Sequence, residues 1–172
     1  LAGWKYKGEL PAEKKAVIIS VPHTSNWDFF WGELAFLSQG IPAFILMKKE
    51  FFFFPLGMIL RALNVIPVDR GNKDSQLVEQ MITEFKQRDS MYLCITPEGS
   101  RKKRKKWKKG FLVIAKAAGV PVYLGRIDYK GKYCEVGPLF YPTEDVDADL
   151  AYIMSTYHDA NPKYPENFSN GN

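Results

Sequence analysis

The chain has 172 residues, of which 46% are hydrophobic and 25% are charged. These proportions are typical of one soluble globular domain and exclude a disordered, collagen-like or low-complexity chain. Two cysteines are too few for a disulfide framework, and we interpret them as reduced thiols in a reducing compartment. The longest stretch without a charge, residues 34–47, has 14 residues, whereas a membrane-spanning helix needs about 20. We therefore expect no segment that spans a bilayer, and the first ten residues lack the apolar core of a secretory signal.

Charge is concentrated in one basic segment. The formal net charge is +5, and residues 101–109, RKKRKKWKK, hold 8 of the 24 Lys and Arg residues. The rest of the chain carries 16 cations against 19 anions, a net charge of −3. Residues 142–172 hold six acids against Lys163 alone. One dense basic segment on a slightly acidic body predicts an anionic partner, which could be phosphate, nucleic acid, an acidic protein or a membrane surface.

The first half of the chain alternates short apolar runs with helical patterns. Residues 16–21 form a β-branched apolar run, which predicts a buried strand. Apolar residues recur at helical spacing over 28–40, so we expect a helix there. We then expect a second strand over 43–47 and a helical segment over 51–63 that is kinked by proline and glycine. A short strand is expected over 65–68.

The second half continues this alternation and then changes to adjacent strands. An apolar stripe over 74–88 predicts an amphipathic helix, and the apolar run 91–95 predicts a strand. Residues 110–119 predict a helix that ends in glycine. Two strands, 121–129 and 132–136, flank a Lys-Gly pair that is typical of a β-hairpin turn.

These elements predict one α/β domain over residues 1–172. Its central sheet should be mostly parallel and flanked by helices, with a late antiparallel hairpin and a short acidic C-terminal tail. Ligands of such sheets bind beyond the carboxyl ends of the strands. We therefore expect the site among three loops that follow predicted strands: 22–28, 69–72 and 96–101.

The first of these loops contains His23, one of only two histidines, and Asp28 begins the expected helix. If the loop folds back, the carboxylate can orient the imidazole and stabilise its protonated form, which makes a general base. No nearby serine or cysteine stands out as a covalent nucleophile, so this base would activate a substrate hydroxyl. The alternative is structural: Asn26 caps the helix, Asp28 interacts with the helix dipole and His23 packs in the loop.

The other two loops carry groups that can bind anions. Arg70 follows a predicted strand and can make a bidentate contact with a phosphate, or it can lie in a solvent-facing turn. In the third loop, Gly99 permits close backbone approach, and Ser100 and Arg101 can donate hydrogen bonds to an anion. Glu98 can accept a hydrogen bond from a substrate hydroxyl or hold a neighbouring cation. The alternative for this loop is a plain strand-to-helix turn.

Four short motifs at these positions resemble the sequence blocks of the glycerolipid acyltransferases, the family of 1-acylglycerol-3-phosphate acyltransferase. In chain order they are His23-x4-Asp28, Val68-Asp69-Arg70, Pro97-Glu98-Gly99-Ser100-Arg101 and Val120-Pro121-Val122. Residues 48–57 and 107–111 are also similar to stretches of that family. The resemblance covers about residues 16–140 and implies a glycerol-phosphate-acyltransferase-like fold. His-x4-Asp alone is common by chance, whereas four blocks in order are specific.

The resemblance implies an O-acyl transfer reaction and a role for each matched residue. His23 would deprotonate the acceptor hydroxyl, and Asp28 would orient His23. The alkoxide would attack the thioester of acyl-CoA or acyl carrier protein directly, without an acyl-enzyme and without a metal or redox cofactor. The acceptor would be a lysophospholipid such as 1-acylglycerol-3-phosphate. The residues that would bind it are Arg70, Glu98, Gly99, Ser100 and Arg101.

Two segments suggest where this chemistry takes place. The aromatic segment comprises Phe51, Phe52, Phe53 and Phe54. It can enter a membrane interface or line an acyl-chain tunnel, although a place in the core is the commoner fate of such a run. The basic segment comprises Arg101, Lys102, Lys103, Arg104, Lys105, Lys106, Trp107, Lys108 and Lys109.

The basic segment can contact anionic lipid head groups, the phosphates of CoA or an acidic carrier protein. Trp107 within it suits a membrane interface. The alternative is a solvated loop without a partner. We therefore expect a cytoplasmic protein that is peripherally associated with the inner face of the membrane.

Two other functions are compatible with these residues. The same chemistry could act on another hydroxylated or amino-acid lipid, because a carboxylate would satisfy Arg70 and Arg101 as a phosphate does. Alternatively, the chain could be a non-catalytic module that binds lipid or nucleic acid through residues 101–109. Binding to single strands usually interleaves aromatic residues with the charges, and only Trp107 interrupts this run. We therefore expect no nucleic-acid partner.

Overall fold

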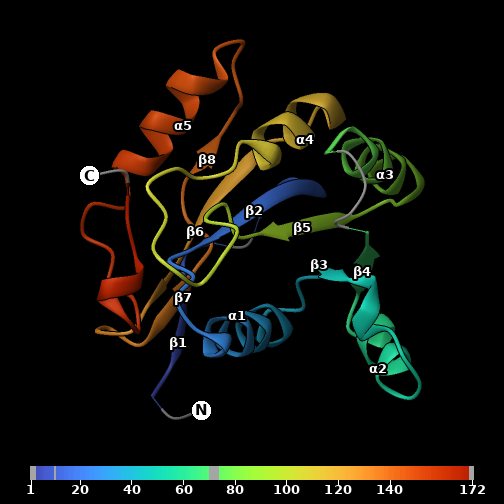
Figure 1. The fold of residues 1–172 in the computed structure, drawn as a ribbon, viewed down its shortest axis with the longest axis horizontal. Coiled ribbons are helices and arrows are strands. Elements are labelled where there is room, and N and C mark those ends of the chain that lie inside the picture. The colour runs from blue at the N-terminus through green and yellow to red at the C-terminus, as the bar shows by residue number, and fades with distance from the viewer. Residues whose placement is uncertain (1–2, 10, 70–73, 171–172) are drawn as a thin grey trace.

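The computed structural model describes residues 3–9, 11–69 and 74–170, which form one α/β domain with helices on both faces of a central sheet (Figure 1). The strands of these residues are β1 (Lys5–Lys7), β2 (Lys15–Val21), β3 (Ala43–Lys48), β4 (Val65–Val68), β5 (Met91–Ile95), β6 (Val122–Asp128), β7 (Tyr133–Glu135) and β8 (Leu139–Phe140). The α-helices are α1 (Asn26–Ser38), α2 (Leu56–Ala62), α3 (Asp74–Gln87), α4 (Gly110–Ala118) and α5 (Val146–Ser155). Two short 3-10 helices are η1 (Lys49–Phe51) and η2 (Pro165–Asn167).

The sheet has the strand order β1-β7-β6-β2-β5-β3-β4, and β8 pairs with β6. β2 lies at the centre and is parallel to both of its neighbours, β5 and β6. β3 and β4 extend the parallel part, whereas β7 and β8 are antiparallel to β6. This confirms the expected mostly parallel sheet with a late antiparallel pair.

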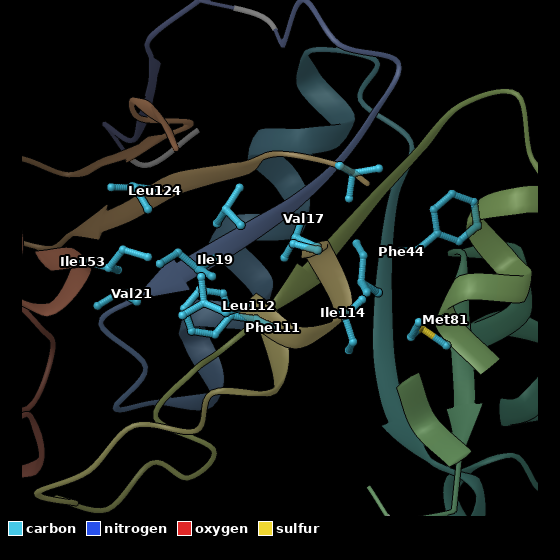
Figure 2. Close-up of a cluster of buried hydrophobic side chains, with 14 of the residues drawn as sticks. Val17, Ile19, Val21, Phe44, Met81, Phe111, Leu112, Ile114, Leu124 and Ile153 are labelled. Carbon is cyan, nitrogen blue, oxygen red and sulfur yellow. The ribbon is translucent and has the colours of Figure 1, made fainter. Parts of the chain in front are cut away.

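The central strand β2 is buried on both faces of the sheet. Val17, Ile19 and Val21 pack into the larger buried cluster, and Ala16 and Ile18 pack into a second, smaller cluster on the opposite face. Strands covered on both faces have near-continuous runs of branched apolar residues, which explains the sequence of β2. Figure 2 shows the larger cluster, in which these β2 side chains meet side chains of α4.

The helices divide between the two faces of the sheet. The larger cluster takes its helical side chains from α3, α4 and α5, and the smaller cluster takes Phe36 from α1. Figure 1 shows α1 and α2 on one side of the sheet and α3, α4 and α5 on the other. The domain is therefore a sandwich of three layers, with the sheet between two layers of helices. The cluster of buried apolar side chains is larger on one face of the sheet than on the other.

The expected strands and helices are present within a few residues, with one difference in the aromatic region. We expected one kinked helical segment over 51–63, but a short η1 is followed by a non-helical stretch, and α2 begins only at Leu56. The backbone of Phe52 packs against Gly57, where an added Cβ would lie 2.7 Å from the Phe52 carbonyl oxygen. The glycine therefore lets the chain fold back on itself, and Pro55 precedes the helix instead of kinking it.

The C-terminal segment, which we expected as a short acidic tail, is folded onto the domain. Leu150 and Ile153 of α5 belong to the larger buried cluster. Tyr157 is fully buried and donates a hydrogen bond to the carbonyl of Gly125 at 2.9 Å. The expectation of a tail followed from the acids of residues 142–172 and overlooked the apolar run at residues 150–154.

Candidate active site

Three loops meet at one edge of the sheet because β2, β5 and β6 are adjacent and parallel. The carboxyl ends of these strands therefore face the same way. The loop after β2 carries His23, the loop after β5 carries Glu98, and Tyr129 directly follows β6. Two of the three loops expected to form the site, 22–28 and 96–101, are thus brought together.

His23 and Asp28 form a pair at this edge. The Nδ1 atom of His23 lies 3.3 Å from Oδ2 of Asp28, and the imidazole is 21% exposed whereas the carboxylate is 2% exposed. This separation is slightly longer than a normal hydrogen bond. Because Nδ1 faces the carboxylate, Nε2 is the nitrogen that remains for a proton of a substrate.

The same carboxylate also holds the start of α1. Ser25 is the N-cap of the helix, and Oδ2 of Asp28 accepts the backbone N–H groups of Thr24 and Ser25, each at 2.7 Å. This capping box satisfies N–H groups that a helix start leaves unpaired. The structural and catalytic interpretations of Asp28 are therefore both compatible with the geometry. The cap, however, is Ser25, not Asn26 as the structural alternative supposed.

Glu98 is buried directly beneath the histidine loop. Its carboxylate accepts the backbone N–H of His23, with the two oxygens at 3.0 and 2.8 Å. Burial and the nearby Asp28 carboxylate raise the pKa of Glu98 to about 8, and the hydrogen bond from His23 opposes this rise. We expected Glu98 to contact a substrate hydroxyl or a cation. Its observed contact is the backbone that carries His23.

The rest of the third loop lies close to the start of α1. Gly99 has a φ of +65°, and an added Cβ would lie 2.8 Å from the Lys108 side chain, so glycine suits this position on both counts. The Ser100 hydroxyl bonds the backbone of Lys102 at 3.1 Å. Arg101 is exposed and donates a hydrogen bond to the Asn26 side chain. A guanidinium group is thereby held beside the loop that carries His23.

Arg70, the expected phosphate ligand of the second loop, lies outside the described residues, as do residues 71–73. Asp69, immediately before it, forms an ion pair with Lys49. β4 is two strands further along the sheet than β5. The strand order thus brings the first and third blocks together without fixing where the arginine of the second block lies.

The basic segment forms a loop whose C-terminal end is held to the domain by hydrogen bonds and an ion pair. The backbone N–H of Lys108 donates to the Pro97 carbonyl at 2.7 Å, and Lys109 pairs with Asp147 of α5. Trp107 is 4% exposed, and its indole N–H donates to the Ser169 carbonyl at 2.9 Å. The expectation that Trp107 contacts a membrane is therefore wrong, because its ring is packed against Tyr157 and Phe168. The exposed cations between these anchors are Lys102, Lys103, Arg104, Lys105 and Lys106.

The aromatic segment is at the surface instead of in the core. Phe54 is 83% exposed, and Phe51 and Phe53 are about half exposed. Phe52 is half-buried, with the Arg61 guanidinium 5.5 Å from its ring centroid. No helix among residues 3–9, 11–69 and 74–170 is both long enough and apolar enough to cross a membrane. Within the same residues, no group of three or more His, Cys, Asp or Glu side chains could hold a metal ion.

Sequence reasoning missed Tyr129, whose hydroxyl donates to Oδ1 of Asp28 at 2.6 Å. Burial and the Asp28 carboxylate raise the pKa of Tyr129, so its hydroxyl is protonated. Tyr129 lies 101 residues from Asp28, so no local spacing could have connected them. Only the pairing of β2 with β6 does so.

The comparisons with known proteins agree with the motifs. The family model described as acyltransferase matches residues 4–124, a range that includes all four blocks. Comparison with curated proteins found no match, and comparison with solved structures found none. Because the matched range covers well over half of the chain, this protein belongs to the acyltransferase family typified by 1-acylglycerol-3-phosphate acyltransferase, and its general chemistry is acyl transfer.

Proposed function

We propose that this acyltransferase moves a fatty acyl group from an acyl thioester to a hydroxyl of a lysophospholipid such as 1-acylglycerol-3-phosphate. The donor would be acyl-CoA or acyl carrier protein. The observation that carries the proposal is the His23–Asp28 pair, in which a partly exposed imidazole lies against a buried carboxylate. Such a pair is suited to general-base activation of a hydroxyl.

The proposed step is a direct transfer. Nε2 of His23 accepts the proton of the acceptor hydroxyl while the hydroxyl oxygen attacks the thioester carbonyl carbon. The carbon–sulfur bond breaks, and the leaving thiolate takes the proton from the imidazolium. Asp28 stabilises the imidazolium during the step, as the aspartate does in other His–Asp pairs. The products are an ester and a free thiol, and the enzyme returns to its starting state.

The polar side chains around the pair favour an anionic acceptor. Arg101 is exposed and held beside the start of α1 by Asn26. A guanidinium group makes strong charge-assisted hydrogen bonds with phosphate. Arg70 is proposed to add a second cation, as in the resemblance, and Ser100 and the backbone of Gly99 would complete the head-group site. Glu98 would support this site indirectly through the backbone of His23.

We also propose that the reaction takes place at an anionic membrane surface, with the α1–α2 side of the domain against the bilayer. This side exposes large apolar side chains: Trp27, Phe29, Phe30, Leu37, Phe51, Phe53, Phe54, Met58 and Ile59. Exposed apolar groups gathered in this way are typical of an interaction surface. The five exposed cations of residues 102–106 add charge complementarity, at about 1 kcal/mol each near anionic head groups.

The first test is consumption of the thioester by the wild-type protein and by His23→Ala. Long-chain acyl-CoA and acyl carrier protein are supplied separately, each with and without lysophosphatidic acid. We expect turnover that requires the acceptor and that His23→Ala loses by at least about 100-fold. His158→Ala is the matched control, because His158 is exposed and is the only other histidine.

The outcomes separate the alternatives. Turnover retained in His23→Ala would overturn the catalytic assignment. Turnover that depends on His23 but not on lysophosphatidic acid would point to a different acceptor, which a set of other lysolipids and hydroxylated aminolipids would identify. No turnover with either donor or any of these acceptors, from a protein that circular dichroism shows to be folded, would overturn the proposed reaction.

A further inference from the structure

The Asp28 carboxylate is held from both of its oxygens. Oδ2 faces Nδ1 of His23 and accepts the N–H groups of Thr24 and Ser25. All of these contacts come from within five residues of Asp28. Oδ1 accepts a hydrogen bond at 2.6 Å from the hydroxyl of Tyr129. Among these interactions, only the one with Tyr129 ties the carboxylate to a distant part of the chain.

Two segments contact Tyr129 directly, and α1 supports one of them. Its backbone N–H donates to the carbonyl of Asn161 at 2.9 Å, in the segment that follows α5. The ring of Trp4 meets the Tyr129 ring edge to face, with centroids 5.0 Å apart. Trp4 in turn stacks on Trp31 of α1 at 4.6 Å. The phenol is therefore oriented by contacts from the N-terminal segment, which α1 supports, and from the C-terminal segment.

The phenol of Tyr129 can serve as a hydrogen-bond donor to Asp28 over the whole neutral pH range. Burial and the Asp28 carboxylate raise the pKa of Tyr129 above its ordinary value, so the hydroxyl keeps its proton at neutral pH. A carboxylate can turn about its Cβ–Cγ bond unless both oxygens are fixed. With Oδ1 bound to the phenol, Oδ2 remains directed at Nδ1 of His23. Hydrogen bonds to a charged acceptor are among the stronger ones in proteins.

We propose that Tyr129 is a positioning residue for the His23–Asp28 pair, which it serves by fixing Oδ1 of the carboxylate so that Oδ2 orients the imidazole. The inference rests on the proposed function, since it concerns the same reaction. Tyr129 lies beyond residues 4–124, the range that the family model matches. The part of the chain after the matched range would therefore supply a residue that orients the His23–Asp28 pair.

The direct test is Tyr129→Phe, which removes only the hydroxyl. We expect kcat to fall about 10-fold, with KM for the thioester and the acceptor changed less than about twofold. The matched control is Tyr157→Phe, which removes a hydroxyl that donates to the Gly125 carbonyl at 2.9 Å and does not touch Asp28. The control should lose stability without a comparable loss of kcat. Equal kcat in Tyr129→Phe and the wild type would overturn the proposal.

A double variant shows whether Tyr129 acts through Asp28. If it does, Tyr129→Phe added to Asp28→Asn lowers kcat no further than Asp28→Asn alone, because the route to His23 is already lost. If the two losses multiply, Tyr129 acts on the reaction by another route and the proposal is wrong. Both variants must show a wild-type circular dichroism spectrum.

A second readout needs no substrate and separates this inference from the proposed function. The imidazole N–H protons of His23 are followed by NMR, with His158→Ala used to assign them, since the chain has only two histidines. We expect the Nδ1–H signal of His23 to shift or broaden in Tyr129→Phe and to be unchanged in Tyr157→Phe. An unchanged signal in Tyr129→Phe would overturn the positioning role. A shifted signal in a protein without acyl transfer would leave that role standing and overturn the proposed reaction.

Discussion

The two faces of the sheet differ in what their helices do with apolar side chains. On the α3–α4–α5 side, apolar side chains such as Met81, Phe111 and Ile153 are buried in the larger cluster. On the α1–α2 side, the smaller cluster takes Phe36, while Leu37 and Met58 are more than half exposed. One face is therefore a closed core that supplies stability, and the other keeps apolar surface available for contact outside the chain.

The helix α1 makes this difference clearest. It is apolar around most of its circumference, and its acidic residues are Asp28 and Glu33. Helices that are apolar all round are usually buried, yet only Asp28 and Phe36 are buried in α1. The buried acid of the helix belongs to the candidate site, whereas its exposed apolar side chains belong to the surface that we propose to contact the membrane.

The largest effect is expected on the closed face. Phe111 is 1% exposed and lies at the centre of the larger cluster (Figure 2). Phe111→Ala should lower the free energy of unfolding by about 3–5 kcal/mol, because it removes a buried aromatic side chain and leaves a cavity. Urea unfolding followed by circular dichroism measures this loss. A cost below about 1 kcal/mol would contradict the view that this face supplies the stability.

The next effect concerns the acid on the open face. Asp28→Asn should lower kcat by about 100-fold or more, since a neutral amide does not stabilise an imidazolium. Asp149→Asn is the matched control: Asp149 is equally buried and accepts hydrogen bonds from Thr143, but it lies in α5. The control should keep full turnover in the thioester assay. Similar losses of kcat in the two variants would show that replacing any buried acid lowers turnover, and that the contact of Asp28 with His23 is not the cause.

A smaller effect is expected from Glu98 and depends on pH. The folded state raises the pKa of this carboxyl from 4.5 to about 8, so the folded state binds the proton more tightly than the unfolded state. Its contribution to stability is therefore complete below pH 4.5 and is lost as the pH rises to 8. The slope contributed by one such group is at most about 1.4 kcal/mol per pH unit.

The variant Glu98→Gln tests this dependence, because it keeps the shape of the side chain and removes its proton equilibrium. Urea unfolding of both proteins at several pH values between 5 and 9 gives the two slopes. We expect the wild type to lose stability with rising pH relative to Glu98→Gln. Identical slopes would mean that ionisation of Glu98 is not suppressed in the folded protein.

The smallest effect on stability is expected at the apolar surface. Phe54 is 83% exposed, so Phe54→Ser should change the free energy of unfolding by less than about 0.5 kcal/mol. Its binding to vesicles of anionic phospholipid should nevertheless weaken by about 10-fold or more, since burying a phenylalanine is worth about 1.5–3 kcal/mol and about 1.4 kcal/mol is a factor of ten. Vesicle co-sedimentation measures this binding.

Tyr152→Ser is the control for this experiment, because Tyr152 is 57% exposed on α5, on the opposite side of the sheet. It should leave vesicle binding unchanged. Equal effects of the two variants would remove the distinction between the faces. Concentration-dependent dimerisation that Phe54→Ser abolishes, in the absence of vesicle binding, would assign the surface to a second copy of the chain.

The amino-acid sequence was enough to predict most of the strands and helices in their order. It also predicted two of the loops that meet at the candidate site. Runs such as 16–21 and 91–95 are dense in branched or large apolar residues, because a central parallel strand is buried on both faces. The motif residues His23 and Glu98 were recognisable because each lies within three residues of the end of such a run. α5 was missed because the acids of residues 142–172 suggested a solvent-exposed tail, although residues 150–154 are apolar and two of them lie in the larger buried cluster.

The tertiary structure alone decided which of the candidate groups meet. Strand order places the ends of β2, β5 and β6 side by side, and this turned Glu98 toward the backbone of His23 and brought Tyr129 to Asp28. It also buried Trp107, which its basic neighbours had suggested was at a surface. The spacing of apolar residues along the chain indicates which segments form strands or helices and which of their faces are buried. Contacts between residues about 100 positions apart depend instead on how the strands are ordered in the sheet.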